Sequence, residues 1–380
     1  MNLSLSDEQV FLREAARGAL SRFKTLEAAR EALDGNADAL PDLWPTAREA
    51  GWPGLLIDEA HGGAGLDAFD AMLVLGECGR VLARVSLLGH LPATTILNDA
   101  PGASTELLSA LADGEQRAAY LPARPPDPSL DGGWSGDPRS GLARPPIATA
   151  EAGGEDGKLT VTGSYAFVPD APGAGVLVGV ALLDGKPVGV LIAADAAGVA
   201  VEEVSRYDAT RSLGHVSLTN APATMLNAPE SSLAGAWHLA QALIAAESLG
   251  SVETALEVTT AYAKERHTFG RAIGSYQAVK HSLTEVLRQL ENGRSLLYYA
   301  GWSRIGAPSE FPLAANAARS VGGRALDQAA RTMISVHGGI GATWEHDAPL
   351  YFRRAQLSRR LLGGTGAASD RVAGELILKA

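Results

Sequence analysis

A cation, an aromatic ring, a turn glycine and an amide lie close together in the stretch KERHTFGRAIGSYQAVKH, as Arg266, Phe269, Gly270 and Gln277. A guanidinium at a helix end can form paired hydrogen bonds to a phosphate or a carboxylate, and an aromatic side chain can pack against a flat ring system. A plain helix hairpin with a surface arginine and a core phenylalanine would show the same spacing. These residues alone therefore leave a ligand site and a structural turn both open.

Three glycines in the stretch SVHGGIGATWEH, namely Gly338, Gly339 and Gly341, form the second candidate. Consecutive glycines let the backbone approach a ligand closely and expose N–H groups to an anion. A glycine-rich helix end explains the pattern equally well. His337 precedes them, and it is either packed in the interior or in contact with a cofactor.

The elements that hold these residues are predicted from periodicity and turn residues. The chain is expected to be helical up to about residue 115, beginning with Ser6 as N-cap and Gln9 three positions later. Residues 124–157 are rich in Pro, Gly, Ser and Asp, which predicts a loop or a connection. A long irregular segment is thus expected to follow the N-terminal helices.

The remaining chain divides into a β-rich part and a helical part. Short alternating runs over residues 158–223, with Asp184-Gly185 as a hairpin turn, predict a small antiparallel β domain. Long helices are expected over residues 236–266 and 277–300, and Leu287 belongs to an apolar stripe on the second of them. Helices of this length predict a four-helix bundle.

Composition narrows the classes of function. The chain has 380 residues and a formal net charge of −11, which argues against nucleic acid and anionic membranes as partners because these need clustered Lys and Arg. Cys78 is the only cysteine, so no internal disulfide can form. No apolar signal core or membrane span is evident, and we expect a cytoplasmic protein. No spacing of His, Cys, Asp and Glu suggests a metal site.

Taken together, these stretches resemble the acyl-CoA dehydrogenase superfamily over nearly the whole chain. RHTFG, with Gln277 seven residues later, is similar to the family's Arg-x-x-Phe-Gly motif, and GGIG is similar to its C-terminal Gly-Gly-x-Gly segment. The resemblance implies an α+β protein with the acyl-CoA dehydrogenase fold. Its parts would be an N-terminal helical domain (1–115), a middle antiparallel β domain with the Pro/Gly-rich connection (116–228) and a C-terminal four-helix bundle (229–380).

The resemblance also implies FAD as cofactor and an acyl-CoA as substrate, desaturated between Cα and Cβ. In this chemistry a carboxylate removes the α proton while a hydride passes to the flavin. The position of the family's usual glutamate is occupied by Gly363, or by Leu362 in another alignment, and the position used by a second subgroup falls near Ala240. No catalytic residue is predicted at these positions. Glu247 is left as either an alternative base or a structural acid.

Residues that touch the flavin ring in the family also differ in this chain. Phe167 could stand in for a tryptophan, but Pro169 at a threonine position has neither a hydroxyl nor an N–H to donate. What matches is the set that the family extends across a subunit interface to the adenine and pyrophosphate end of FAD. The resemblance therefore assigns to cofactor binding, with His337 beside the glycines, the residues Arg266, Thr268, Phe269, Gln277, His337, Gly338, Gly339 and Gly341.

Three hypotheses are compatible with this pattern. The chain resembles the non-catalytic member of heteromeric, α2β2 acyl-CoA dehydrogenases of sterol side-chain degradation, which would complete the FAD site of a homologous catalytic chain. Alternatively, it forms a self-sufficient homotetramer that uses Glu247, or it is a non-enzymatic scaffold of the same fold. The empty base positions favour the first hypothesis, because a positioned base is typically worth ~10²–10⁴ in rate.

Overall fold

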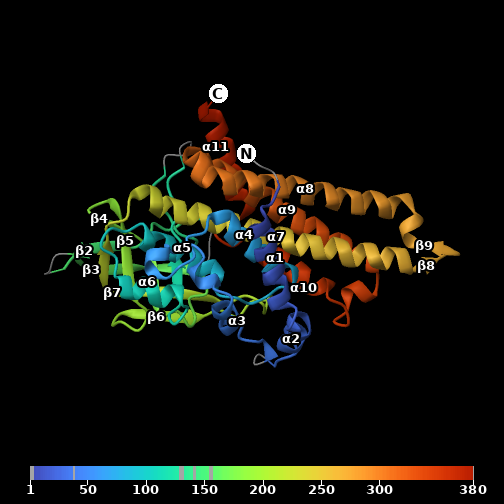
Figure 1. Ribbon diagram of the computed structural model, residues 1–380, viewed down its shortest axis with the longest axis horizontal. Coiled ribbons are helices and arrows are strands. Elements are labelled where there is room, and N and C mark those ends of the chain that lie inside the picture. The colour runs from blue at the N-terminus through green and yellow to red at the C-terminus, as the bar shows by residue number, and fades with distance from the viewer. Residues whose placement is uncertain (1–3, 37–38, 128–131, 140–142, 154–156, 380) are drawn as a thin grey trace.

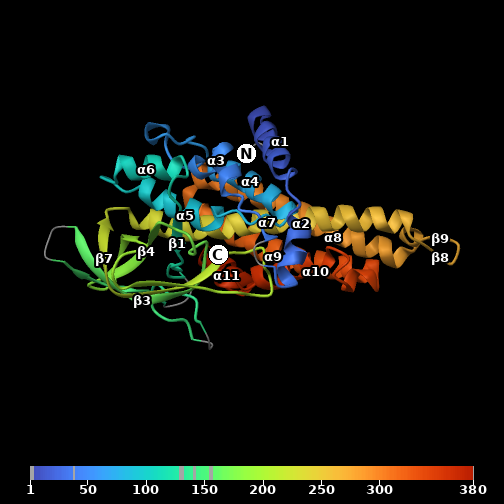
Figure 2. The same ribbon diagram turned by 90° about the horizontal axis from the view of Figure 1, so that it is seen from below.

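The structure, a computed structural model, describes residues 4–36, 39–127, 132–139, 143–153 and 157–379. A set of short helices, a sheet and a set of long helices follow one another along the chain (Figure 1). The sheet lies at one end of the elongated molecule, and the small hairpin of β8 and β9 lies at the opposite end in both views (Figure 1, Figure 2). The α+β architecture expected from the sequence is confirmed.

The N-terminal part is helical, as predicted, and its first helix begins at the expected cap. The Ser6 hydroxyl accepts a hydrogen bond from the Gln9 N–H at 3.2 Å, and the Gln9 side-chain oxygen accepts from the Ser6 N–H at 3.1 Å. This reciprocal pair satisfies two backbone donors that a helix start leaves free. The helices are α1 (Asp7–Leu20), α2 (Thr25–Leu33), α3 (Trp44–Glu49), α4 (Ala68–Arg80), α5 (Leu87–Asn98) and α6 (Thr105–Ala112).

The middle part is a seven-stranded sheet in which β4, β2, β3, β7 and β5 pair in a closed ring. The predicted turn at Asp184-Gly185 joins β4 to β5 with φ values of +51° and +77°, which suit a two-residue hairpin. The strands are β1 (Ala118–Leu121), β2 (Thr149–Ala152), β3 (Lys158–Pro169), β4 (Val176–Leu183), β5 (Lys186–Ala193), β6 (Val199–Glu203) and β7 (Leu213–Leu226).

Two details of this sheet differ from the prediction. Most strand pairs are antiparallel, but β1 and β2 each pair with β4 in parallel. Parallel neighbours need a long crossover, and the chain between β1 and β4 supplies it. Strand β2 lies within the segment predicted to be a loop. Its sequence TAEA does not predict a strand, and the strand forms because β2 pairs with β3 and β4. Part of that segment, 128–131, 140–142 and 154–156, lies outside the described residues.

The C-terminal part contains the long helices. Helix α7 runs 36 residues and ends one residue before Arg266, and α8 begins at Gln277, as expected. Leu287 belongs to the apolar stripe expected on α8, yet this residue is 46% exposed because α8 is the outer helix (Figure 1). The elements are α7 (Glu230–Glu265), β8 (His267–Thr268), β9 (Arg271–Ala272), α8 (Gln277–Gly306), α9 (Phe311–His337), α10 (Ala348–Ser358) and α11 (Gly364–Lys379).

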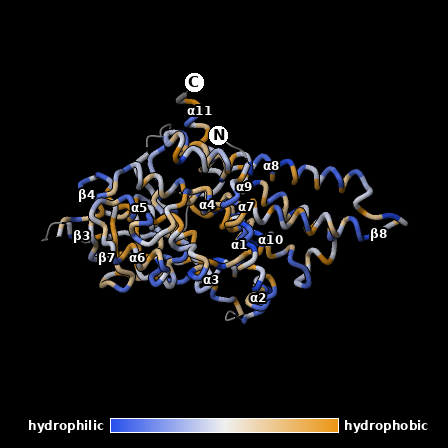
Figure 3. The backbone as a smooth tube through the Cα atoms, in the orientation of Figure 1, coloured by the Kyte–Doolittle hydropathy of each residue, from blue (hydrophilic) through white to orange (hydrophobic). Residues whose placement is uncertain are grey.

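The core lies where the helices meet the sheet. Helix α5 is buried along almost its whole length, and α4, α7 and α9 pack together beside it. In Figure 3 the outer helix α8 carries long hydrophilic stretches, whereas hydrophobic residues gather in the interior. Across the described part of the chain, no helix combines the length and the apolar character that crossing a bilayer requires. The same residues contain no cluster of three or more His, Cys, Asp or Glu side chains that could hold a metal ion.

Candidate functional site

The first candidate region is the tip hairpin, residues 266–277, which joins α7 to α8 at the end of the molecule opposite the sheet (Figure 1). The Arg266 N–H donates to the Tyr262 carbonyl at 2.8 Å, and the Arg266 carbonyl accepts from the Ile273 N–H at 2.8 Å. The Tyr276 hydroxyl donates to the Thr268 carbonyl at 3.3 Å. These bonds hold the hairpin in one shape against the last turn of α7.

The ring of Phe269 stands at the turn of the tip hairpin. Its φ is +49°, a value that is unfavourable for a bulky residue, and that of Gly270 is +78°. The Phe269 side chain is 93% exposed, so it gains little packing within this chain. Arg266, Thr268 and Gln277 are exposed as well. The hairpin therefore presents a strained aromatic residue and three polar side chains to its surroundings.

The second candidate region is the glycine turn, residues 337–341, at the end of α9. The His337 ring stacks on Tyr262 with ring centres 4.3 Å apart and lies 4.1 Å from the His346 ring. Because Tyr262 also accepts the Arg266 N–H, the glycine turn lies beside the base of the tip hairpin. The two stretches that the sequence singled out are thus brought to the same end of the helical part.

His337 itself differs from the expectation that it faces a cofactor. It is only 4% exposed, and its Nδ1 lies 2.7 Å from the Met333 carbonyl. Its ring is in contact with the rings of Tyr262 and His346. The structure therefore gives His337 the interior packing role that the sequence left as its alternative.

The three glycines serve different purposes. Gly338 has φ +65° and ψ −135°, a combination that only glycine adopts without strain. A Cβ on Gly341 would lie 2.7 Å from the Ile334 carbonyl oxygen, so packing within the chain requires this glycine. A Cβ on Gly339 would meet nothing within 4 Å, and its φ of −54° suits any residue. Nothing within this chain accounts for glycine at position 339.

The third region is the inner cavity, a space of about 520 Å³ lined by Asp137, Phe167, Tyr207, Leu361 and Gly363, together with four arginines. Gly363 occupies the position at which the resemblance places the family's usual catalytic glutamate. The Gly363 N–H donates to Asp137 Oδ2 at 3.0 Å. A carboxylate from the connection between β1 and β2 therefore lies one hydrogen bond from the empty base position.

Sequence reasoning missed Asp137. It belongs to the segment WSGDPRS, in which no periodicity fixes where a side chain points. Burial raises the pKa of Asp137, and the Gly363 N–H and the charge of Arg319 oppose that rise. The carboxylate is thus more basic than an ordinary aspartate.

Two side chains besides Asp137 hold the turn that carries Gly363. Gln241 donates to the Leu362 carbonyl at 3.1 Å, and Arg319 donates to the Leu361 carbonyl at 3.1 Å. Both Leu362 and Gly363 have positive φ, at +52° and +77°. A glutamate introduced at position 363 would therefore have to adopt a strained backbone in a turn that is already fixed.

Glu247 lies in a buried charge cluster with Asp208, Arg211 and Arg354. Its Oε1 accepts from Arg354 Nη1 at 2.7 Å, and its Oε2 accepts from Arg211. Arg354 also donates to Asp208 Oδ2 at 2.7 Å. The void next to Glu247 measures only about 10 Å³, too small for a substrate. This geometry favours the structural interpretation of Glu247 over a role as base.

The arginines of the C-terminal helices and the aromatic residue considered as a flavin contact are dispersed. Arg354 is buried in the charge cluster, Arg353 donates to the Tyr207 carbonyl at 2.6 Å, and Arg360 lines the inner cavity. Phe167 does line that cavity, but the Arg206 guanidinium lies 4.6 Å from its ring centre. One face of the aromatic ring that could stand in for a flavin-contacting tryptophan is therefore already covered.

Comparison with known proteins gives a consistent result. The model of the acyl-CoA dehydrogenase N-terminal domain matches residues 6–124, and that of the acyl-CoA dehydrogenase C-terminal domain matches residues 234–376. The acyl-CoA dehydrogenase FadE34 of Mycobacterium tuberculosis is 33% identical over 377 residues, which cover 96% of this chain and 47% of FadE34. The chain thus spans about half the length of that relative.

Two solved structures are similar over 99% of both chains. A Tcur3481-Tcur3483 steroid ACAD variant has a TM-score of 0.85 and 28% sequence identity. The crystal structure of the ChsE4-ChsE5 complex from Mycobacterium tuberculosis has a TM-score of 0.85 and 25% identity. Each name joins two proteins, Tcur3481 with Tcur3483 and ChsE4 with ChsE5.

Proposed function

The chain belongs to the acyl-CoA dehydrogenase family, and from that premise we propose that it is a subunit of an FAD-dependent acyl-CoA dehydrogenase that completes the FAD site of a neighbouring chain. The reaction is the α,β-desaturation of an acyl-CoA thioester. The bound FAD would supply the hydride acceptor for that reaction. The residues of this chain would bind and orient one end of the cofactor.

One observation carries the proposal: Phe269 is held at a positive φ and is 93% exposed. Strained residues persist where the surrounding structure enforces them, and they concentrate at functional sites. In the glycine turn, near the base of the tip hairpin, the open space over Gly339 leaves room for the backbone to approach another molecule. The tip hairpin and the glycine turn therefore fit a cofactor end that arrives from outside this chain.

Each exposed residue of the tip has a chemical role in this proposal. The Arg266 guanidinium would pair with a phosphate oxygen of FAD, and the Phe269 ring would pack on its adenine. Thr268 and Gln277 would add hydrogen bonds, and the N–H groups near Gly338 and Gly339 would face the diphosphate. His337 would support the glycine turn through its stacking on Tyr262 and would not touch the cofactor.

The inner cavity does not fit the flavin ring in the manner of the family. Pro169 cannot donate a hydrogen bond, Phe167 is covered by Arg206, and the usual base position is Gly363. We therefore propose a homologous catalytic chain as partner, in an α2β2 assembly, which would hold the flavin ring and supply the usual base. The two similar structures are each named for two proteins, which supports this choice. One of them is a steroid ACAD, which favours an acyl-CoA whose acyl group is the side chain of a sterol.

The rival hypotheses make different demands on the chain. A homotetramer based on Glu247 needs that carboxylate to be free, whereas both of its oxygens bind arginines. A non-enzymatic scaffold would give Phe269 and Arg266 no ligand.

We place the protein in the cytoplasm, where its single buried cysteine would remain a thiol.

The test is the flavin content of a mixed complex. The chain would be co-expressed with a homologous chain that carries the usual glutamate, and bound FAD would be counted per pair of chains after gel filtration. Arg266→Ala and Phe269→Ala should each lower FAD affinity by about 10-fold or more, the loss expected for a charge-assisted hydrogen bond or a buried aromatic contact. Unchanged flavin content in both variants would refute the proposal.

A further inference from the structure

The inner cavity contains one carboxylate among the described residues that line it, and this carboxylate is Asp137. The side chain lies at the position where the family's base is missing, because its Oδ2 accepts the Gly363 N–H at 3.0 Å. That bond orients the carboxylate without using Oδ1. The chain has therefore lost a glutamate from one segment and placed an aspartate from another beside the same turn.

The rest of the cavity wall is suited to a negative charge that develops on a bound thioester. Four arginines line it, and Arg206 is fixed there by its contact with the Phe167 ring. Cations that are already in place stabilise an oxygen that becomes negative, and they do so more strongly in a partly enclosed site than in water. The four arginines are Arg139, Arg144, Arg206 and Arg360.

Apolar side chains occupy the other part of the wall. Phe167, Leu357 and Leu361 offer a surface against which an acyl chain can pack. A volume of about 520 Å³ is within the usual range for a small-molecule site. The cavity thus combines a carboxylate, cations and an apolar wall, the groups that removal of a proton next to a carbonyl requires.

We propose that Asp137 is a proton acceptor in this chain's own cavity and that it removes the α proton of an acyl thioester without any flavin. This inference rests on the proposed function only for its substrate class, an acyl-CoA. The Cα–H bond breaks, its electron pair forms the carbon–carbon double bond of an enolate, and the thioester oxygen takes the negative charge. The proton forms an O–H bond on Asp137 and can exchange with solvent before it returns to Cα. No atom is oxidised or reduced in this cycle.

The surroundings of Asp137 agree with this role. Burial raises its pKa, which makes the ionised carboxylate a stronger base. The charge of Arg319 from α9 acts on this carboxylate, and the four arginines of the wall line the same cavity. The rate of proton removal should therefore rise with pH through a pKa above the ordinary value of 3.8.

Deuterium incorporation tests the proposal. The chain without flavin would be incubated with hexanoyl-CoA in D₂O, and deuterium at Cα would be followed by mass spectrometry. Incorporation by the unaltered chain should exceed that in buffer, and Asp137→Asn should reduce it by ~10²–10⁴-fold. The asparagine oxygen can still accept the Gly363 N–H, so the fold of this variant should be preserved. Arg360→Gln should give a smaller reduction, because the other arginines remain.

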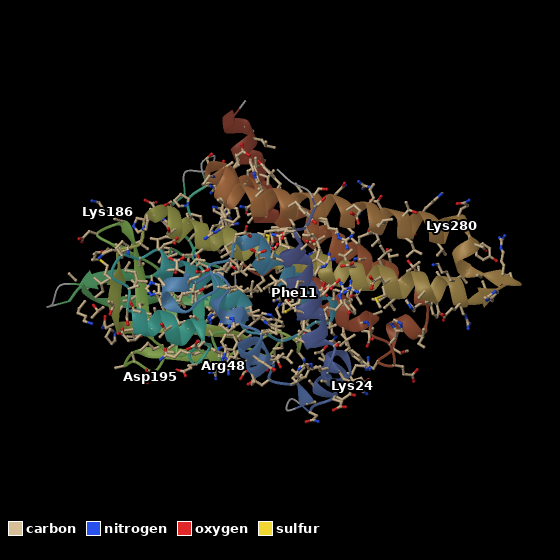
Figure 4. All side chains as sticks on the ribbon, in the orientation of Figure 1. Phe11, Lys24, Arg48, Lys186, Asp195 and Lys280 are labelled. Atoms are coloured by element: carbon tan, nitrogen blue, oxygen red, sulfur yellow. The ribbon has the colours of Figure 1, made fainter. Side chains whose placement is uncertain are left out.

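Asp195 provides the matched control, since it is an exposed aspartate in the turn after β5 (Figure 4) and does not line the inner cavity. Asp195→Asn should incorporate deuterium like the unaltered chain. No incorporation above buffer by the unaltered chain, or equal incorporation by Asp137→Asn, would overturn the proposal. The flavin content of a mixed complex with Asp137→Asn should be unchanged, so this result is separate from the test of the tip hairpin.

Discussion

The tip hairpin and the charge cluster use arginine in opposite ways. Arg354 is buried and donates hydrogen bonds to Asp208, Glu247 and Thr210, whereas Arg266 is exposed at a helix end and bonds within the chain through its backbone. The Arg354 side chain stabilises the fold through buried ion pairs, whereas the exposed Arg266 side chain makes no contact on which the fold depends. This difference indicates where function lies in this chain. Functional side chains should be those that the backbone holds in a fixed place although they make no stabilising contact within the chain.

The largest effect on stability should come from Arg354→Met. Removal of this guanidinium takes away the ion pair of Asp208 and leaves Glu247 paired with Arg211 alone, and breaking a buried ion pair costs about 3–5 kcal/mol. Urea unfolding measures the loss. The matched variant Arg266→Met should change the free energy of unfolding by no more than ~0.5 kcal/mol. Equal losses in the two variants would abolish the contrast between the two arginines.

The second prediction concerns the pH dependence of stability and the buried carboxyl of Asp170. This residue follows Pro169 and accepts a hydrogen bond from the Gly89 N–H at 2.8 Å. Burial raises its pKa to about 6 from 3.8, so the folded state binds the proton more tightly than the unfolded state. Stability should therefore fall as pH rises from about 4 to about 6, by roughly 2–3 kcal/mol for this group.

Asp170→Asn should remove that fall in stability. Thermal unfolding of both proteins across this pH range measures it, with Asp195→Asn as an exposed control that should keep the slope of the unaltered chain. The same slope in Asp170→Asn would show that this carboxyl does not titrate as its burial predicts.

The glycine turn offers a closer comparison between two neighbouring positions. Gly341→Ala would place a Cβ 2.7 Å from the Ile334 carbonyl oxygen and should destabilise the chain by ~1–3 kcal/mol, the usual cost of overpacking. Gly339→Ala meets nothing within 4 Å and should leave stability within ~0.5 kcal/mol. It should nevertheless weaken FAD binding in a mixed complex. A stable Gly341→Ala would mean that the turn can rearrange.

The smallest effect on stability should be that of Phe269→Ala. The ring is 93% exposed, so its removal takes away little packing, and the free energy of unfolding should stay within ~0.5 kcal/mol. Urea unfolding of the isolated chain measures this. A loss of more than about 1 kcal/mol would show that the ring stabilises its own chain, and the argument for an outside ligand would lose its main support.

The sequence predicted those features that local chemistry determines. The cap at Ser6, the turn at Asp184-Gly185 and the end of α7 before Arg266 follow from residue types within a few positions of each other. The family resemblance extended this to the whole fold. The domain boundaries at residues 115 and 228, and the assignment of cofactor contacts to the tip hairpin and the glycine turn, remain predictions.

Features that depend on long-range packing were not predicted. Strand β2 forms because β3 and β4 pair with it, and Leu287 is exposed because α8 is the outer helix. The sequence left burial of His337 as one of two alternatives, and it could not identify Tyr262, from a different helix, as the ring that stacks on it. Asp137 lies 226 positions from Gly363 along the chain, and no local pattern could place the two side by side.

The central claim is that this chain presents its FAD contacts to another chain and holds no flavin by itself. The most direct measurement is the number of FAD molecules per chain, determined for the isolated chain and for its complex with a homologous catalytic chain. The account predicts an isolated chain without flavin and a complex with one FAD per pair of different chains. One FAD bound to each copy of the isolated chain would contradict it.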